Sequence, residues 1–327
     1  MWRSFFKDKK WFYWSYGGGF FILLLLVSQT YLDVLFNSWY KEFYDILQTA
    51  EKRNISELWD SIEKFRYIAL PYVTLFAFTN WFTRLWAFRW REAMTFSYMP
   101  YWRATEAKVE GSSQRIQEDC MAFAKIVESI GLQVVKAIMT LIAFIPILWT
   151  LSSNVTVPFL DNVSGSLVWV ALVLSIGGIL ISWFVGIKLP GLEYNNQKVE
   201  AAFRKDLVLG EDDKIKYAQP ERLFELFTGI RINYHRLFLH TSYFNFWLNL
   251  YDQFVSIALL LVMGPGLFTG VITFGVLIQA NNAFDRVHNS FNIILYNWTT
   301  ITELRSIWKR LYEFEGNLDK YLKTEGV

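Results

Sequence analysis

Six apolar stretches, each close to the ~20 residues that an α-helix needs to cross a bilayer, constrain this chain more than any other feature. They lie at about 12–36, 67–88, 130–151, 166–187, 238–263 and 271–298. The segments beside them hold few Pro or Gly residues, so we expect the helices to continue beyond the lipid. The pattern predicts an all-α membrane protein with about six long transmembrane helices and cytoplasmic extensions. We expect a single transmembrane domain over residues 1–327.

The Lys and Arg residues alternate between the two sides of the expected membrane. Of the chain's 32 such residues, 25 fall in the N-terminal segment, the connections 84–125 and 188–236, and the tail. Positive residues collect on the cytoplasmic side, so both termini are predicted to be cytoplasmic. A soluble helical bundle would leave this alternation unexplained, as well as the uncharged segment 166–187. We also expect tight turns between spans, among them those at Asn54–Ser56 and Gly264-Pro-Gly266.

Composition and missing motifs exclude several classes of protein. The net charge of +2 is too small to indicate a nucleic-acid-binding protein. A single cysteine, Cys120, and three His make a metal site improbable. The sequence holds no phosphate-binding loop and no nucleophile elbow. We therefore expect no cofactor, no ATP bound by this chain and no enzymatic activity.

Polar residues recur at helical spacing within three of the six stretches, which places each set on one helix face. Ionisable groups inside a membrane are costly and usually face a partner or water. Three such faces predict a shared wet cavity, although polar side chains also join membrane helices to one another. The fourth stretch is expected to face lipid. The candidate cavity and substrate residues are Asp33, Asn37, Trp39, Tyr40 and Tyr44 in the first stretch, Asn249 and Asp252 in the fifth, and Asn282, Asp285, Asn289 and Asn292 in the sixth.

Two segments on the predicted cytoplasmic side concentrate carboxylates. Carboxylates in a partly dry vestibule can exchange protons near neutral pH, whereas carboxylates on a wet helix face form ordinary ion pairs, such as Glu200 with Arg204. Glu118 and Glu193 are favoured because they lie close to the ends of predicted spans. The candidate proton-coupling residues are Glu110, Glu118, Asp119, Glu193 and Glu200.

Several long runs can be compared with known families: Phe88–Met94, Glu110–Asp119, Gly186–Glu193, Val199–Lys205, Gly210–Asp213 and Trp298–Glu303. Together they resemble the SbmA/BacA family of peptide-antibiotic transporters. The resemblance covers nearly the whole chain, and longer members carry additional hydrophobic sequence before this point. It implies a homodimer in the bacterial inner membrane with a core similar to the transmembrane domain of ABC exporters. It also implies import of peptides, including antimicrobial ones, driven by the proton gradient, with a glutamate at the position of Glu118 in proton coupling.

Two alternatives stay open at this point. Related proteins with a fused ATPase domain import cobalamin and other hydrophilic solutes, so the chain could be the transmembrane subunit of an ABC transporter. A separate ATPase chain would then dock on a cytoplasmic connection such as Glu200–Arg204. A membrane scaffold or receptor that transports nothing is the third possibility, against which the polar helix faces argue.

Overall fold

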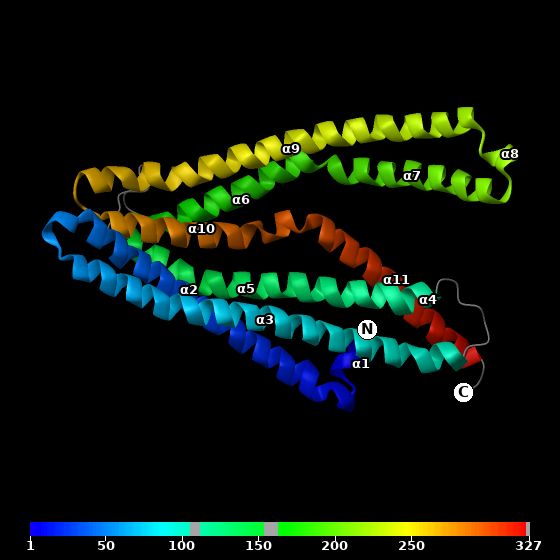
Figure 1. Ribbon diagram of the computed structural model, residues 1–327, viewed down its shortest axis with the longest axis horizontal. Helices are drawn as coiled ribbons and strands as arrows, with labels where there is room; N and C mark the ends of the chain where they lie inside the picture. Colours follow the sequence, from blue (N-terminus) through cyan, green and yellow to red (C-terminus); the bar gives the residue numbers. More distant parts are fainter. Residues whose placement is uncertain (105–111, 154–162, 325–327) are drawn as a thin grey trace. The chain divides into compact units, whose positions relative to one another are not determined.

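The computed structural model describes residues 1–104, 112–153 and 163–324 (Figure 1). Within those ranges the secondary structure is helical and contains no β-strand. The longest helix, α3 (Ile55–Ala104), has 50 residues. At 1.5 Å per residue it extends about 75 Å, more than twice the hydrocarbon thickness of a bilayer. A helix of this length would continue beyond the lipid if residues 67–88 cross the membrane as the sequence predicts.

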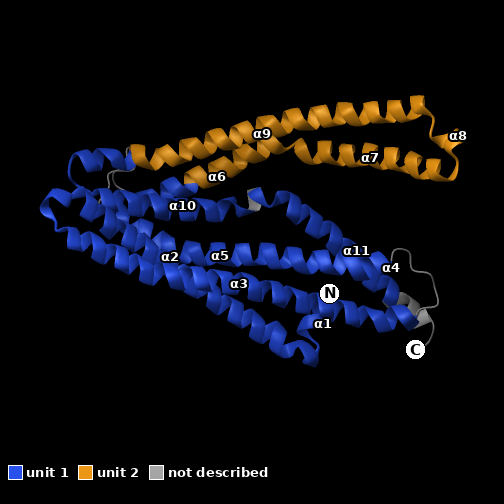
Figure 2. Cartoon of the chain, viewed as in Figure 1, with its two compact units in different colours: residues 1–172, 262–327 blue, residues 173–261 orange. Residues whose placement is uncertain are grey.

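The chain folds into two compact units, which Figure 2 colours separately. Unit 1 comprises Met1–Leu172 and Val262–Val327, and unit 2 comprises Val173–Leu261. The shorter elements of unit 1 are α1 (Trp2–Phe6), η1 (Lys9–Trp11), η2 (Tyr13–Gly18), η3 (Ala50–Lys52), α4 (Ser112–Gln114) and η4 (Arg115–Asp119). Its longer helices are α2 (Gly19–Gln48), α3, α5 (Cys120–Ser152), α10 (Phe274–Tyr296) and α11 (Trp298–Thr324). Unit 2 contains α7 (Leu189–Asp212), α8 (Lys214–Tyr217) and most of α6 (Ser166–Gly186) and α9 (Pro220–Phe268).

Four helices form the body of unit 1. Helix α10 packs on α5 and α2, while α3 packs on α2 and α5 (Figure 1). An aromatic cluster joins the predicted cytoplasmic halves of α3 and α5, where Trp90 is 1% exposed and meets Phe123 edge to face at 5.6 Å. Buried aromatic pairs of this kind contribute about 0.5–1.5 kcal/mol beyond their burial. This packing fixes α3 against α5.

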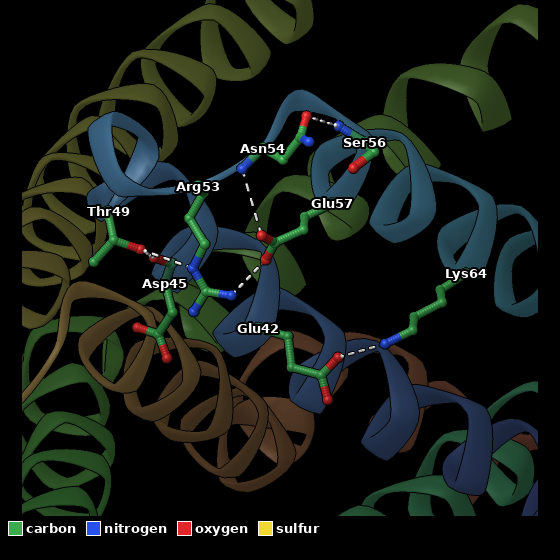
Figure 3. A network of polar contacts seen from close by, with 8 residues as sticks. All are labelled: Glu42, Asp45, Thr49, Arg53, Asn54, Ser56, Glu57 and Lys64. Carbon is green, nitrogen blue, oxygen red and sulfur yellow. Dashed lines mark hydrogen bonds and ion pairs between the residues drawn. The ribbon is translucent and has the colours of Figure 1, made fainter.

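The turn between α2 and α3 is held by a network of short-range polar contacts (Figure 3). Asn54 caps α3, accepting a hydrogen bond from the Ser56 amide at 3.3 Å, and its own amide donates to Glu57 at 3.4 Å. This reciprocal arrangement is a capping box. Arg53 pairs with Glu57, and Lys64 on α3 reaches Glu42 on α2 at 3.3 Å. The expected turn at Asn54–Ser56 is thus present.

Unit 2 is built on the packing of α6 against α9. The Trp247 indole donates to the Ser182 hydroxyl at 2.9 Å, and the Tyr251 hydroxyl donates to the Leu174 carbonyl at 2.6 Å. Gly178 permits this approach, because a Cβ there would lie 2.1 Å from the Tyr251 ring. Farther along the unit, Arg222 pairs with Asp206 between α9 and α7. Tight contacts therefore hold α9 alongside both α6 and α7.

Among the described residues, four helical segments are long and apolar enough to cross a membrane: Lys9–Gln48, Ser112–Ser152, Ser166–Asp212 and Pro220–Phe268. The predicted spans at 67–88 and 271–298 lie on α3 and α10, which are more polar, so the count of six stays a prediction.

The predicted turn at Gly264–Gly266 is wrong. Helix α9 continues through these residues to Phe268, because Pro265 in the last turn removes only one backbone hydrogen bond. The chain reverses beyond Phe268, where Gly270 adopts a φ of +74°.

Candidate functional site

The polar faces of α2 and α10 meet inside unit 1 around a cavity of about 220 Å³. This α2–α10 cavity is lined from three helices. The lining residues are Asp33, Phe36, Asn37 and Tyr40 of α2, Phe144 of α5, and Asn282, Asp285, Arg286 and Asn289 of α10. The structure therefore brings together two of the three polar faces that the sequence contains.

An ion pair between a buried carboxylate and a partly exposed guanidinium lies in the lining of this cavity. An Arg286 Nη atom lies 2.9 Å from an Asp33 carboxylate oxygen, and the Asp33 side chain is 1% exposed. Tyr72 of α3 and Lys136 of α5 also act on the Asp33 charge. Removing a carboxylate from water is costly unless opposite charges and hydrogen bonds compensate it. Side chains from α3, α5 and α10 thus interact with the Asp33 carboxylate of α2.

The hydrogen bonding of this centre is incomplete within the described residues. Neither Asp33 oxygen receives a hydrogen bond of good geometry, despite the close Arg286 cation. Both polar atoms of the Asn37 amide are likewise buried without a hydrogen-bond partner among the described residues. An unsatisfied buried polar group costs about 1–3 kcal/mol. Such groups are suited to receive water or the polar part of a ligand.

Two contacts at one end of α10 position this site. The first backbone amides of α10, those of Phe274 and Gly275, donate to Gln48 at 2.7 Å and Asp45 at 3.0 Å on α2. Because the N-terminus of a helix presents unpaired amides and a positive partial charge, an acceptor from α2 stabilises α10 there. A Cβ at Gly275 would lie 2.1 Å from the Lys41 carbonyl oxygen, so glycine allows the close approach.

Three other candidates of α2 and α10 do not line the cavity. Trp39 is 9% exposed, donates to the Ser61 carbonyl at 2.8 Å and stacks on Phe43, so it joins α2 to α3. Tyr44 packs edge to face on Phe274 at 5.4 Å. Asn292 is buried and pairs with the His288 ring at 2.8 Å. Helical spacing placed these residues close to the polar face but could not show which neighbours they contact.

The third polar face lies in unit 2. Asn249 and Asp252 are exposed on α9. The Asn249 amide donates to the Asn245 carbonyl at 2.7 Å, and Ser256 donates to the Asp252 carbonyl at 2.8 Å. The face is thus solvated or turned towards something outside its own unit. A chamber shared by all three faces stays a prediction.

The acidic candidates separate into different environments. Glu118 is exposed and accepts a hydrogen bond from Gln114 at 3.1 Å. On α7, Glu193 is exposed and Glu200 is half-buried. Glu110 lies outside the described residues. Asp119, by contrast, is 3% exposed and pairs with Arg115 and Arg310, each at 2.7 Å.

The surroundings of Asp119 point to a structural role. It lies outside the span predicted at 130–151. Burial by itself would raise the pKa of this carboxyl, but hydrogen bonds from Arg310 and Arg115 outweigh it and hold the pKa below its ordinary value. Asp119 therefore remains ionised at neutral pH and ties α11 to η4. A carboxylate held in this way is poorly suited to carry protons, in contrast to the sequence-based hypothesis.

Comparison with known proteins decides the family. The family model described as SbmA/BacA-like matches residues 8–319. The chain belongs to the SbmA/BacA-like family. That match covers every helix described above except α1 and the end of α11, reaches into both units, and confirms the family resemblance inferred from the sequence.

Two curated relatives extend the comparison to ABC transporters. The chain is 26% identical over 314 residues to the Escherichia coli K12 inner membrane ABC transporter ATP-binding protein YddA, covering 90% of this chain and 55% of the relative. It is also 26% identical over 318 residues to ABC transporter D family member 2, chloroplastic, of Arabidopsis thaliana, covering 91% of this chain and 42% of that protein. The chain thus spans about half the length of these relatives. Together with the apolar helices, the family and these relatives identify a membrane transporter.

Proposed function

We propose that this chain forms the transmembrane part of a homodimeric importer in the bacterial inner membrane, driven by the proton gradient and carrying peptides or similar bulky hydrophilic solutes. Membership of the SbmA/BacA-like family supports this proposal. The observation that carries it is the α2–α10 cavity, where the buried Asp33 carboxylate pairs with Arg286 and the Asn37 amide has no hydrogen-bond partner among the described residues. Intramembrane charges of this kind are typical of substrate and ion pathways.

The size of the cavity supports the proposal of a homodimer. The 220 Å³ enclosed by α2, α5 and α10 is smaller than the roughly 300–1,000 Å³ of a pocket for a drug-sized ligand. A peptide needs a wider chamber, which a second copy of the chain would provide. Exposed aromatic side chains such as Tyr31 and Phe76 would then be available for contacts of low specificity.

Proton coupling is assigned to Glu118 in preference to Asp119. Glu118 is exposed and is held only by Gln114 among the described residues, so proton exchange with water is open to it. It neighbours Asp119, whose ion pairs join α11 to the start of α5. A change of charge at Glu118 would therefore act on a junction between helices of unit 1.

Uptake by proteoliposomes tests this proposal. We expect a labelled peptide to accumulate when a pH gradient is imposed without nucleotide. The variant Glu118→Gln should lower that uptake by about a hundredfold or more, the lower end of the loss typical for a missing proton-transfer group. The matched control is Glu313→Gln, which removes an exposed carboxylate on α11 and should transport normally. Undiminished uptake by Glu118→Gln would remove this residue from the coupling mechanism.

A second candidate function rests on the names of the relatives. Both are ABC transporters, and the E. coli relative is named for ATP binding, so a separate ATPase chain could drive transport by this protein. The same proteoliposomes distinguish the two cases. Uptake that requires ATP and an added nucleotide-binding subunit, and ignores the pH gradient, would favour the ABC alternative. A scaffold would show no uptake under either condition.

A further inference from the structure

A larger cavity in unit 1 has no described lining residue in common with the α2–α10 cavity. It has a volume of about 740 Å³ and lies among α2, α3 and α5. Four cationic side chains line it: Arg84 and Arg91 on α3, and Lys125 and Lys136 on α5. Arg84 and Arg91 are seven residues apart, so two helical turns bring them to one face of α3. Glu128 is the single carboxylate among the described lining residues of this basic cavity.

None of these four cations forms a close ion pair within the described part of the chain: no described carboxylate comes within 4.0 Å of any of them. Arg84 and Lys125 are exposed, whereas Arg91 and Lys136 are half-buried. Other half-buried Arg side chains, such as Arg115 and Arg310, do have a carboxylate partner at that distance. Glu128 acts on Arg84 and Lys125 only from a greater distance. Cations gathered in a cavity repel one another unless an anion joins them. The charge of this cavity is therefore complementary to an anionic ligand.

Much of the remaining lining is apolar. Leu26, Phe76, Phe88, Met121 and Leu132 line the same space, and Phe88 and Phe76 are 54% and 47% exposed. Polar side chains line it as well, including Asn80, Ser129 and Gln133, and the buried Gln29 amide donates to Thr79 at 2.8 Å. A small hydrated anion would leave these apolar walls uncovered, whereas an amphiphile would cover them. Cationic and apolar surfaces in one cavity indicate a ligand that has both an anionic group and an apolar body.

The position of the cavity along the helices agrees with such a ligand. Arg91, Lys125 and Glu128 lie just beyond the predicted spans 67–88 and 130–151 on their cytoplasmic side, and Arg84 and Lys136 lie within about two turns of those ends. This is the depth of lipid phosphates, and basic pockets between helices on the cytoplasmic side bind anionic headgroups. We propose that the basic cavity binds the phosphate group of an amphiphile, with Arg84, Arg91 and Lys125 around the phosphate and Phe76 and Phe88 along its apolar part.

Binding of phosphatidylglycerol to the purified full chain in detergent tests this proposal. We expect the double variant Arg84→Gln/Arg91→Gln to bind about tenfold or more weakly, since each Lys or Arg near anionic lipid contributes about 1 kcal/mol. The control Lys214→Gln/Lys216→Gln removes the same charge from the exposed helix α8 and should bind as the wild type does. Size-exclusion profiles establish that both proteins are folded.

A variant that is expected to strengthen binding distinguishes an effect on the ligand site from a loss of structure. Glu128→Gln removes the carboxylate of the cavity, so we expect phosphatidylglycerol to bind a few-fold more tightly, a result that misfolding would not produce. Two further probes distinguish the sources of the phosphate. Glycerol 3-phosphate, which lacks the apolar body, and phosphatidylcholine, which has no net charge, should both bind at least about tenfold more weakly.

Equal binding of phosphatidylglycerol by the site variant and the α8 control would overturn the proposal. Equal binding of glycerol 3-phosphate and phosphatidylglycerol would overturn the assignment to an amphiphile. The measurement involves no transport, so its outcome is independent of the proton-coupling experiment.

Discussion

Replacing Arg286 with alanine should destabilise the protein by about 2–4 kcal/mol. The change leaves the Asp33 carboxylate, 1% exposed, without its closest cation. Removal of one partner from a fully buried pair costs about 3–5 kcal/mol, and we lower this value because the Arg286 side chain is 40% exposed. The measurement is the midpoint of thermal unfolding in detergent, with the wild type alongside.

The double variant Asp33→Asn/Arg286→Ala provides the control for this prediction. Since it removes the stranded charge together with its partner, it should be more stable than Arg286→Ala alone. We expect the highest unfolding midpoint for the wild type, a lower one for the double variant and the lowest for Arg286→Ala. A single variant as stable as the wild type would show that Arg286 does not compensate Asp33, and the description of the α2–α10 cavity would be wrong.

A side chain at Gly275 should have an effect of similar size for a steric reason. A Cβ at this position would lie 2.1 Å from the Lys41 carbonyl oxygen and 2.5 Å from the Asp45 carboxylate. Backbone cannot move aside as a flexible side chain can, so α10 would have to shift away from α2 and lose the acceptors of its first amides. We expect Gly275→Ala to cost about 3 kcal/mol or more, at the upper end for overpacking.

Gly131→Ala is the matched control for that substitution. Gly131 lies within α5, where a Cβ would meet nothing within 4 Å. Alanine there should be neutral or stabilising by up to about 1 kcal/mol, because it favours the helix. Thermal unfolding of both variants measures the difference. Similar midpoints for the two would contradict the close contact between α2 and α10.

The sequence predicted correctly those features that depend on a single helix. Apolar stretches of membrane length predicted the long helices, and spacings of three and four predicted the shared face of Asp33 and Asn37 on α2 and of Asn282 and Asp285 on α10. The polarity of α10 limited this approach, since its spanning character is less evident than that of α5. The prediction of a turn at Gly264–Gly266 was wrong because Pro and Gly also occur in the last turn of a helix.

Contacts between helices were beyond the reach of such patterns. Asp119 resembled its neighbour Glu118 in sequence, yet a partner 191 residues away, Arg310, determines its role. Trp39 shares a helix face with cavity residues. Its indole nevertheless donates to the Ser61 carbonyl of α3, a contact that the sequence of α2 alone could not predict. Tyr72 and the four cations of the basic cavity were missed for the same reason. The seven-residue spacing of Arg84 and Arg91 was the one local signal that could have indicated them.

The central claim is that the polar faces of α2 and α10 enclose a water-filled chamber within a membrane protein. Cysteine labelling with a hydrophilic maleimide tests it directly, and the native background is suitable. Cys120 is the single cysteine and is 0% exposed, and burial raises the pKa of its thiol to about 12. Because the thiolate is the reactive form, Cys120 should remain unlabelled at neutral pH.

The decisive comparison is between Asn289→Cys, in the lining of the cavity, and Leu180→Cys, 53% exposed on the apolar helix α6. In membrane vesicles we expect Asn289→Cys to react at least about tenfold faster, because a thiol surrounded by lipid meets neither water nor the reagent. Equal labelling of the two positions, or labelling of Leu180→Cys alone, would contradict the account.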